Sequence, residues 1–422
     1  MLCSTVLSSA QQFSVDVLNY TVLSADDLTV SVSGHAENLP DELVIPSTVT
    51  YEGTEYTVTE LGRTSLMNTS ITGIVLPSTL TKLGYGCLRN SKITSITLPS
   101  SVSTIDSYAM SLCILTSIII EDGDQPISIY PYSLPFDDYY LYLGRNPLYY
   151  NSDGELADPY WDETPFSMSS GLKDLEIGPE VTEFPAESFL NSPYLESVVI
   201  QPGKLKSISS RLFSQNKKFK EVVLPETLTE IESSAFNGCI ALTGITIPNS
   251  VTTLGASAFN GCTSLKYASL PSDIETIPTQ LFYKCNLSSI VIPGDVSSIG
   301  YNAFVGCPLA EIRCQPIVPP SVDVYTFNDY SNPYDYSGTL YVREGCEEAY
   351  RTAKVWKNFA DIQTTDIFTS VDGIRADDGP VRVYNLNGAC VMEGEASTIG
   401  SLSAGIYIVE RSTGETSKII IR

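Results

Sequence analysis

The hexapeptide Ser-Ala-Phe-Asn-Gly-Cys occurs twice, at Ser234–Cys239 and at Ser257–Cys262, and its two copies are 23 residues apart. The repeat extends well beyond these copies, because prolines recur at steps of 22 or 23 residues at Pro179, Pro202, Pro225, Pro248, Pro271 and Pro293. A fixed period of this length is typical of chains that fold as a stack of similar coils. The period therefore predicts a solenoid.

Each repeat carries the pattern of a single β-strand. In the element Leu242-x-x-Ile245-x-Ile247, the two isoleucines alternate with exposed positions, which is the periodicity of a half-buried strand. Pro248 has no amide hydrogen and is expected to end the strand. Phe236 is expected to fill the middle of the coil, so Phe259→Ala should leave a costly cavity.

The opposite wall of each coil begins with an apolar residue, and this register defines ten units. They have 22–24 residues in the regular part and begin near Val58, Leu80, Val102, Asp158, Val181, Leu205, Leu228, Val251, Ile274 and Val296. One unit cannot bury its apolar face alone, so stability should come from contacts between neighbours. The fold class predicted for residues 58–317 is a β-rich leucine-rich-repeat solenoid with a parallel sheet and short turns or helical pieces.

One repeat position holds a small side chain that is often cysteine. Cysteines occupy this position in five units, at Cys113, Cys239, Cys262, Cys285 and Cys307, and Ser, Thr or Asn in the others. Cysteine at such a site behaves as a small buried residue with a weak donor. We expect an inert column of thiols; disulfides between neighbouring coils stay an alternative, and Cys314 with Cys346 is a further possible pair.

Composition narrows the functional classes. The net charge of −25 disfavours nucleic-acid partners, and His35 is the single histidine, which argues against imidazole catalysis and histidine-rich metal sites. No apolar run is long enough for a transmembrane helix. The acidic run Glu121–Asp124 could hold calcium but lacks complete EF-hand spacing. We predict no catalytic residue, no cofactor, no metal and no enzymatic activity.

The units L-T-x-I-x-x-x-A-F-x-G-C-x-x-L-x-x-I-x-I-P closely resemble the BspA-like leucine-rich repeats of bacterial surface proteins. The resemblance extends to an N-terminal β cap over residues 13–57 and to a closing cap with a short helix over residues 318–364. In the latter, Ala349, Tyr350, Ala353 and Trp356 share one predicted helical face. It implies a surface-exposed protein that binds host matrix proteins or other cells.

The two ends of the chain predict export. Residues 1–12 resemble the end of a secretory signal peptide. Residues 366–422 resemble the C-terminal sorting domain of secreted Bacteroidota proteins, which implies a small β-sandwich-like domain read by outer-membrane secretion machinery. Strands are expected around Val381–Tyr384, Ile406–Val409 and Lys418–Ile421. We expect a secreted protein displayed at the outer-membrane surface, with sorting, anchoring or purely structural roles for this tail left open.

Candidate ligand contacts come from two features. The outward positions of the predicted strands are mostly small or β-branched, and the distinctive ones are Asp174, Glu176, Tyr267, Glu311 and Arg313. A Tyr-rich insert at 123–157 interrupts the repeat, and it and its flank contribute Tyr140, Tyr142, Tyr149 and Trp161. Aromatic side chains beside carboxylates can anchor a protein or stack on sugars. Both sets could equally be ordinary solvated or structural positions.

These observations predict an adhesion or protein-interaction protein whose partner is a host matrix protein or another cell-surface protein. A glycan-binding module that uses the aromatic insert is the main alternative. A passive spacer without a ligand is the third.

Overall fold

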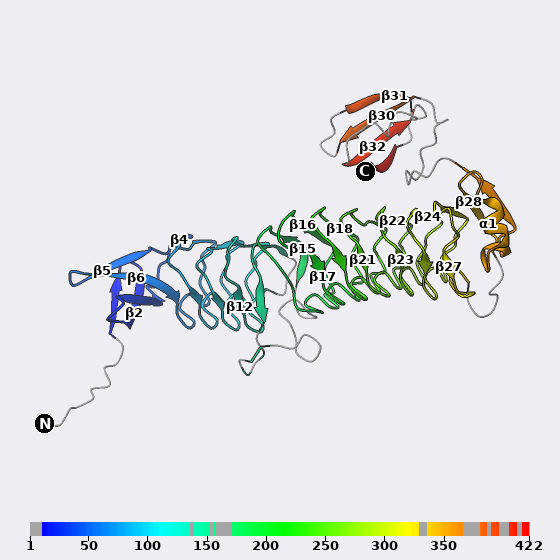
Figure 1. Ribbon diagram of the computed structural model, residues 1–422. Helices are drawn as coiled ribbons and strands as arrows, with labels where there is room; N and C mark the ends of the chain where they lie inside the picture. Colours follow the sequence, from blue (N-terminus) through cyan, green and yellow to red (C-terminus); the bar gives the residue numbers. More distant parts are fainter. Residues whose placement is uncertain are drawn as a thin grey trace. The chain divides into compact units, whose positions relative to one another are not determined.

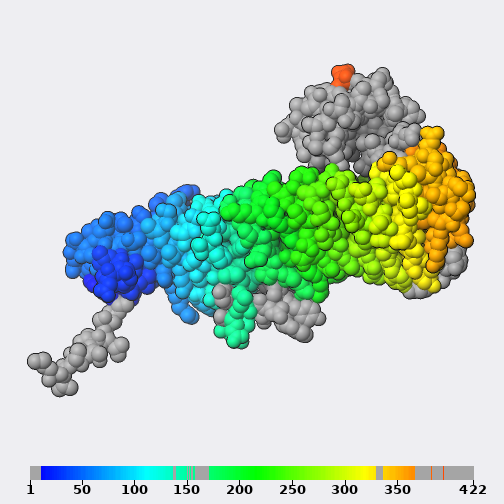
Figure 2. All heavy atoms as spheres, viewed as in Figure 1, coloured from blue at the N-terminus to red at the C-terminus, as the bar shows by residue number. Residues whose placement is uncertain are grey.

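The computed structural model describes residues 11–135, 139–149, 151, 153, 155–156, 171–328 and 336–365, together with four strands between 380 and 421. The chain divides into two compact units, Met1–Gln363 and Thr364–Arg422. In the first unit the coils follow one another in sequence order along one axis (Figure 1), and their side chains pack without interruption from coil to coil (Figure 2). Its described part makes about twelve turns.

The longer strands of the coils form one wall of the solenoid, which we call the long-strand wall. Neighbours pair in parallel where ladders are formed, for example β11 with β9 and β13. The wall comprises β4 (Glu42–Val44), β7 (Gly73–Val75), β9 (Ser95–Leu98), β11 (Ser117–Ile120), β13 (Tyr139–Leu143), β15 (Leu172–Ile177), β16 (Ser197–Ile200), β18 (Glu221–Val223), β20 (Gly244–Thr246), β22 (Tyr267–Ser269), β24 (Ser289–Ile292), β26 (Glu311–Cys314), β28 (Thr339–Val342) and β29 (Asp361–Thr364).

Shorter strands line the opposite side of the coils, and we call them the short-strand wall (Figure 1). They too pair in parallel, for example β10 with β8 and β12. The wall comprises β8 (Lys82–Leu83), β10 (Thr104–Ile105), β12 (Ile127–Ile129), β14 (Pro147–Tyr149), β17 (Ser207–Ile208), β19 (Glu230–Ile231), β21 (Thr253–Leu254), β23 (Thr276–Ile277), β25 (Ser298–Ile299) and β27 (Ser321–Val322).

The predicted register is confirmed by burial. Ile245 and Ile247 point into the core, and nine of the ten predicted unit starts are buried apolar residues, the exception being Asp158, which lies outside the described residues. The phenylalanines of successive coils form a column of stacked rings with centroids 5.3–5.8 Å apart, at Phe189, Phe213, Phe236, Phe259, Phe282, Phe304 and Phe327. Each of these seven coils therefore fills the same space with the same ring.

The cysteine position has a structural role. The thiol of Cys262 donates to the carbonyl of Phe236 in the preceding coil at 3.2 Å, and Cys239, Cys285 and Cys307 make the equivalent contact at 3.1 Å. Asn216 donates its amide to the carbonyl of Phe189 at 2.9 Å, which explains why Asn replaces Cys there. All of these cysteines are free, and so are Cys314 and Cys346, so the suggested pair is wrong: Cys314 instead accepts a hydrogen bond from Tyr350.

Two coils add to the ten expected. One, formed by β12 and β13, lies within the segment predicted to be an insert at 123–157, and β13 pairs with β11 and β15 in the main ladder. The other, formed by β27 and β28, lies within the predicted closing cap, where Phe327 continues the column of rings. Neither coil was predicted, because β13 and β28 are not followed by the proline that ends the strands of the regular units.

The N-terminal cap is β-structure. It comprises β1 (Gln12–Val15), β2 (Leu18–Ser24), β3 (Thr29–His35), β5 (Thr48–Tyr51) and β6 (Thr54–Leu61). β5 and β6 form an antiparallel hairpin, and β6 then pairs in parallel with β8, so the cap continues directly into the short-strand wall. The stacked rings of Phe13 and Tyr51 help to close this end of the core.

The C-terminal cap uses helix α1 (Glu347–Thr352) and the 3-10 helix η1 (Trp356–Asn358). Tyr350 and Trp356 are fully buried, and they donate hydrogen bonds of 2.7 Å to the carbonyls of Pro316 and Pro320. The expected single helical face is wrong in detail, because α1 ends at Thr352 and Ala349 is exposed. The helical part of the C-terminal cap is instead the short helix α1 followed by the 3-10 turn η1.

The second unit contains an antiparallel sheet in the order β31-β30-β32-β33. Its strands are β30 (Pro380–Asn385), β31 (Cys390–Glu395), β32 (Gly405–Arg411) and β33 (Thr416–Ile421). Three of the four lie where strands were expected, and β31 was missed. The described residues show one sheet; a sandwich stays a prediction.

Candidate functional site

The outward side of the long-strand wall is the surface on which most of the candidate residues lie. Two rows of side chains run along it, because the strands share one register. The first row comprises Glu42, Gly73, Ser95, Ser117, Tyr140, Asp174, Ser197, Glu221, Gly244, Tyr267, Ser289, Glu311 and Thr339. The second comprises Val44, Val75, Thr97, Ile119, Tyr142, Glu176, Val199, Val223, Thr246, Ser269, Val291, Arg313 and Tyr341. We call these two rows together the outer face.

Several apolar side chains of the second row are left in solvent. Val44 is 62% exposed, Val75 53%, Val223 48%, Val199 39% and Ile119 36%. Val44 lies opposite Val75 in the ladder, and Val199 lies opposite Val223. The row therefore presents two apolar stretches on either side of Tyr142 and Glu176.

The structure brings together candidates that the sequence placed in separate features. Tyr140 and Asp174 lie opposite each other on β13 and β15, and so do Tyr142 and Glu176. The hydroxyl of Tyr140 donates to Glu176 Oε2 at 2.5 Å, and the side-chain amide of Gln201 donates to Glu176 Oε1 at 2.5 Å. Partial burial and the bond to Glu176 raise the pKa of Tyr140, so its hydroxyl stays a donor at neutral pH.

Tyr142 is held in the same way. Its hydroxyl donates to Asp122 Oδ1 at 2.6 Å, and burial and this bond raise its pKa. The bond passes directly over Gly178, where an added Cβ would lie 2.5 Å from the Tyr142 hydroxyl oxygen and 2.9 Å from Asp122 Oδ1. A glycine is thus required at this position for the Tyr142–Asp122 pair to form. We call Asp122, Tyr140, Tyr142, Asp174 and Glu176 the tyrosine–carboxylate cluster.

Asp174 completes the cluster and accepts a hydrogen bond of 2.6 Å from the hydroxyl of Ser197. Among the described residues Asp174 makes no ion pair, and Lys173, Lys218 and Lys220 act instead on Glu196. A hydrogen bond from Lys220 is the main cause that lowers the pKa of Glu196, with electrostatic contributions from the other two lysines.

The remaining strand candidates lie nearer the C-terminal cap. Tyr267 is 52% exposed on β22, and Glu311 and Arg313 form an ion pair on β26. The guanidinium of Arg313 also lies over the ring of Tyr341, 5.5 Å from its centroid. These residues are separated from the tyrosine–carboxylate cluster by β16, β18 and β20, so they form a second group.

Two other aromatic predictions have different outcomes. Tyr149 lies on the short-strand wall and is 1% exposed, so it is a core residue and its selection as a ligand contact is wrong. Trp161 lies outside the described residues.

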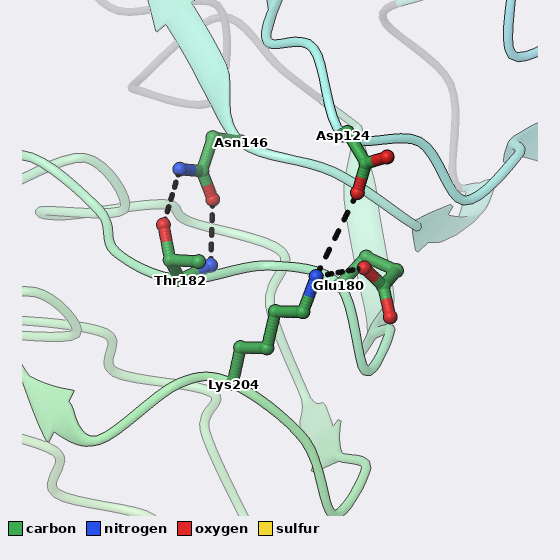
Figure 3. Close-up of polar contacts among 5 residues, drawn as sticks. All are labelled: Asp124, Asn146, Glu180, Thr182 and Lys204. Atoms are coloured by element: carbon green, nitrogen blue, oxygen red, sulfur yellow. Dashed lines mark hydrogen bonds and ion pairs between the residues drawn. The ribbon is translucent and has the colours of Figure 1, made fainter.

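Polar contacts connect the coils that precede and follow the interruption between residues 149 and 171 (Figure 3). The amide of Asn146 donates to Thr182 Oγ1 at 2.6 Å and accepts from the Thr182 backbone amide at 2.7 Å. Lys204 lies between Glu180 and Asp124, bonded to the former and 3.7 Å from the latter. These contacts join side chains from both sides of the interruption.

Ion pairs between residues one repeat apart also connect neighbouring coils, and they were not predicted from the sequence. Lys204, Arg211 and Lys220 pair with Glu180, Glu187 and Glu196, each 24 residues earlier, and Lys218 lies over the ring of Tyr194. Opposite charges at the repeat spacing are the signal that could have revealed these contacts. These four basic residues therefore join two neighbouring coils.

The suggested calcium site has no support in the described residues, where no group of three or more His, Cys, Asp or Glu side chains is arranged to hold a metal ion. Asp122 is bound to Tyr142, and Asp124 pairs with Lys204. The described part of the chain also has no helix with the length and apolarity to cross a membrane.

Comparisons with known proteins agree with the repeat. The family model for the BspA type leucine rich repeat region matches residues 55–134 and 182–311 in six copies. No curated protein matches the chain.

Solved structures with a similar course of the chain come from several bacteria. A leucine-rich cell surface protein from Faecalibacterium prausnitzii is 19% identical, with 86% of this chain and 97% of that chain covered and a TM-score of 0.30. The pneumococcal vaccine antigen PcpA is 15% identical, with 85% and 99% covered and a TM-score of 0.31. A leucine-rich repeat protein from Bacteroides ovatus is 19% identical, with 79% and 100% covered and a TM-score of 0.30.

TM-scores this low say nothing of shared partners. The family assignment rests on the repeat itself, which the family model matches and the coils display. This chain belongs to the BspA-type leucine-rich-repeat family.

Proposed function

We propose that this chain is a non-enzymatic cell-surface protein that binds another protein on its outer face. The observation that carries the proposal is the exposed apolar row at Val44, Val75, Ile119, Val199 and Val223. Large exposed apolar patches rimmed by polar residues mark interaction sites in soluble proteins, and here two apolar stretches lie on either side of Tyr142 and Glu176. A face that extends over many strands of one wall suits a protein surface better than a small molecule, which needs a concave pocket.

The proposal is tested by binding to a panel of immobilised extracellular-matrix proteins and glycans, at low and high salt. The key variant is Val199→Glu/Val223→Glu, which places charge on the exposed row without touching the core. Its matched control is Ile317→Glu/Val318→Glu, since these two residues are 68% and 77% exposed and lie off the long-strand wall. We expect saturable protein binding that the first variant abolishes and the control retains.

Glycan binding is the second candidate, favoured by the position of Tyr140 and Tyr142 beside Glu176 and Asp174. Aromatic rings next to carboxylates are a common way to hold sugars. Binding of glycans alone, lost in Tyr140→Ala/Tyr142→Ala or in Trp161→Ala, would establish this reading. Absence of binding to every protein and glycan would favour a passive spacer.

We also propose that the protein is secreted and displayed at the outer-membrane surface, with residues 366–422 recognised by the secretion machinery. The support is the resemblance of this tail to sorting domains and of residues 1–12 to a signal peptide. The test is deletion of residues 366–422 followed by cell fractionation. Retention of the shortened chain inside the cell is the expected result, and unchanged surface display would contradict the proposal.

A further inference from the structure

Acidic side chains outnumber basic ones on the outer face. The two rows contain five carboxylates, at Glu42, Asp174, Glu176, Glu221 and Glu311, and one basic side chain, Arg313, which is paired with Glu311. Among the described residues, none of the other four carboxylates makes an ion pair, and the adjacent Asp122 makes none either. The face thus carries an uncompensated negative charge.

The nearby basic side chains have other partners. Lys204 is held by Glu180 and Asp124, and Lys220 by Glu196. Neither side chain can be recruited to the centre of the face without breaking these contacts. Among the described residues, these two lysines are therefore committed to other carboxylates and do not neutralise the face.

The centre of the face has carboxylates and aromatic rings that suit the binding of cations. Each tyrosine hydroxyl donates to a carboxylate, Tyr140 to Glu176 and Tyr142 to Asp122. These bonds fix the direction of the carboxylates, which when ionised have no donor of their own and can only accept hydrogen bonds. The two rings themselves offer faces that attract ammonium and guanidinium groups. Preoriented carboxylates beside aromatic rings are a suitable receptor for lysine and arginine side chains.

Apolar positions flank this centre at a defined distance. Ile119, Tyr142, Glu176 and Val199 occupy consecutive strands in one row. Neighbouring strands lie about 4.8 Å apart, so Ile119 and Val199 are separated by roughly 14 Å, with the cluster between them. A partner that matches both features needs basic side chains in the middle and apolar ones on both sides.

We infer that the outer face binds a protein segment in which lysine or arginine side chains, flanked by apolar ones, contact the tyrosine–carboxylate cluster. This inference rests on the proposed function of the same face and names the chemistry of its partner. Charge complementarity distinguishes this partner from a neutral glycan and from a second copy of this acidic chain.

The test uses the full chain and three synthetic peptides of equal length with the same valine-rich flanks. Their centres carry two lysines, two serines or two glutamates, and a neutral gluco-oligosaccharide is the fourth probe. The variant Asp174→Asn/Glu176→Gln removes two charges from the cluster. Its matched control, Glu226→Gln/Glu275→Gln, removes two exposed charges that make no ion pair in the described chain and lie outside the two rows.

We expect the lysine peptide to bind most tightly, to weaken as salt rises, and to lose about tenfold in affinity in the cluster variant but not in the control. Equal binding of the three peptides, or an unchanged affinity in the cluster variant, would overturn the inference. Binding of the oligosaccharide alone would overturn it in favour of a glycan.

The proposed function can fail independently. If the valine variant Val199→Glu/Val223→Glu abolishes binding of a matrix protein but Asp174→Asn/Glu176→Gln does not, the face binds proteins and the basic partner is wrong. If the lysine peptide binds and depends on the cluster while the valine variant keeps full matrix-protein binding, the cluster is a cation-binding site and the protein-binding row is wrong.

Discussion

The regular coils over residues 228–295 differ from the irregular coils over residues 121–178 in the side chains of both walls. In the former, Phe236, Phe259 and Phe282 fill the core and the outer face shows small residues such as Gly244 and Thr246. In the latter, the core contains Tyr139 and Tyr149, and the outer face carries the tyrosine–carboxylate cluster. The regular coils thus repeat the same buried ring, whereas the coils that depart from the repeat carry tyrosines and carboxylates on the surface.

A core residue of the regular coils should show the largest effect on stability. Phe259 is fully buried between the rings of Phe236 and Phe282. We expect Phe259→Ala to lower the free energy of unfolding by about 3–5 kcal/mol, because the cavity opens in a packed column. Denaturant unfolding would measure this. Ile240→Ala, at a side chain 42% exposed, is the control and should change stability by less than about 0.5 kcal/mol. An unchanged transition in Phe259→Ala would contradict the assigned register.

The irregular coils depend on a buried polar residue as well. Arg145 is 1% exposed and donates to the carbonyls of Ser100 and Pro99 at 2.5 and 3.1 Å, and burial lowers its pKa. Arg145→Met would leave these carbonyls without this donor, and we expect a loss of about 1–3 kcal/mol. Lys92→Met, at an exposed side chain, serves as the comparison in the same unfolding assay. Higher stability in Arg145→Met would show that the buried charge costs more than its bonds contribute.

The thiol column should respond to loss of the donor more than to loss of sulfur. Cys262 donates to the Phe236 carbonyl at 3.2 Å. Cys262→Ala removes this bond and should cost about 0.5–1.5 kcal/mol, whereas Cys262→Ser keeps a donor and should cost less. Equilibrium unfolding of the two variants side by side decides the point. A serine variant that is the less stable of the two would mean that sulfur packing, and not donation, selects cysteine.

The contacts across the interruption should matter least. Lys204 pairs with Glu180 and Asp124, but its side chain is 52% exposed. We expect Lys204→Met to lower stability by about 0–1 kcal/mol at low salt and by less at high salt, since exposed ion pairs are weak and screened. Lys266→Met, at an exposed lysine for which the structure shows no ion pair, controls for the loss of a positive charge. A large loss of stability that does not depend on salt would show that the contacts of Lys204 are essential for joining the coils before and after the interruption.

Most of the solenoid could be predicted from the sequence, because a coil is a local pattern and Phe236 or Ile245 reports its own position within it. The two additional coils could not be predicted. β13, for example, lies in a segment without the repeat pattern, and only its pairing with β11 and β15 shows that it belongs to the wall. Tyr149 was misassigned for the same reason: composition identifies an aromatic cluster but not which wall each ring faces.

The tyrosine–carboxylate cluster was predictable in parts only. Asp174, Glu176, Tyr140 and Tyr142 were each distinctive in the sequence, but their juxtaposition depends on strands 30 or more residues apart in one register. Asp122 and Gly178 were not identified as members at all. The need for a glycine beneath the Tyr142–Asp122 bond follows only from the folded arrangement.

The most direct test compares the outer face of the irregular and the regular coils against one partner. Binding of a matrix protein from the panel would be measured with the full chain, with Tyr142→Ala/Glu176→Gln, and with Thr246→Ala/Ser269→Ala on β20 and β22. We predict that the first variant loses about tenfold or more in affinity while the second binds like the unaltered protein. Equal losses in both variants, or a loss only in the second, would contradict the claim that the tyrosine–carboxylate cluster lies at the centre of the binding face.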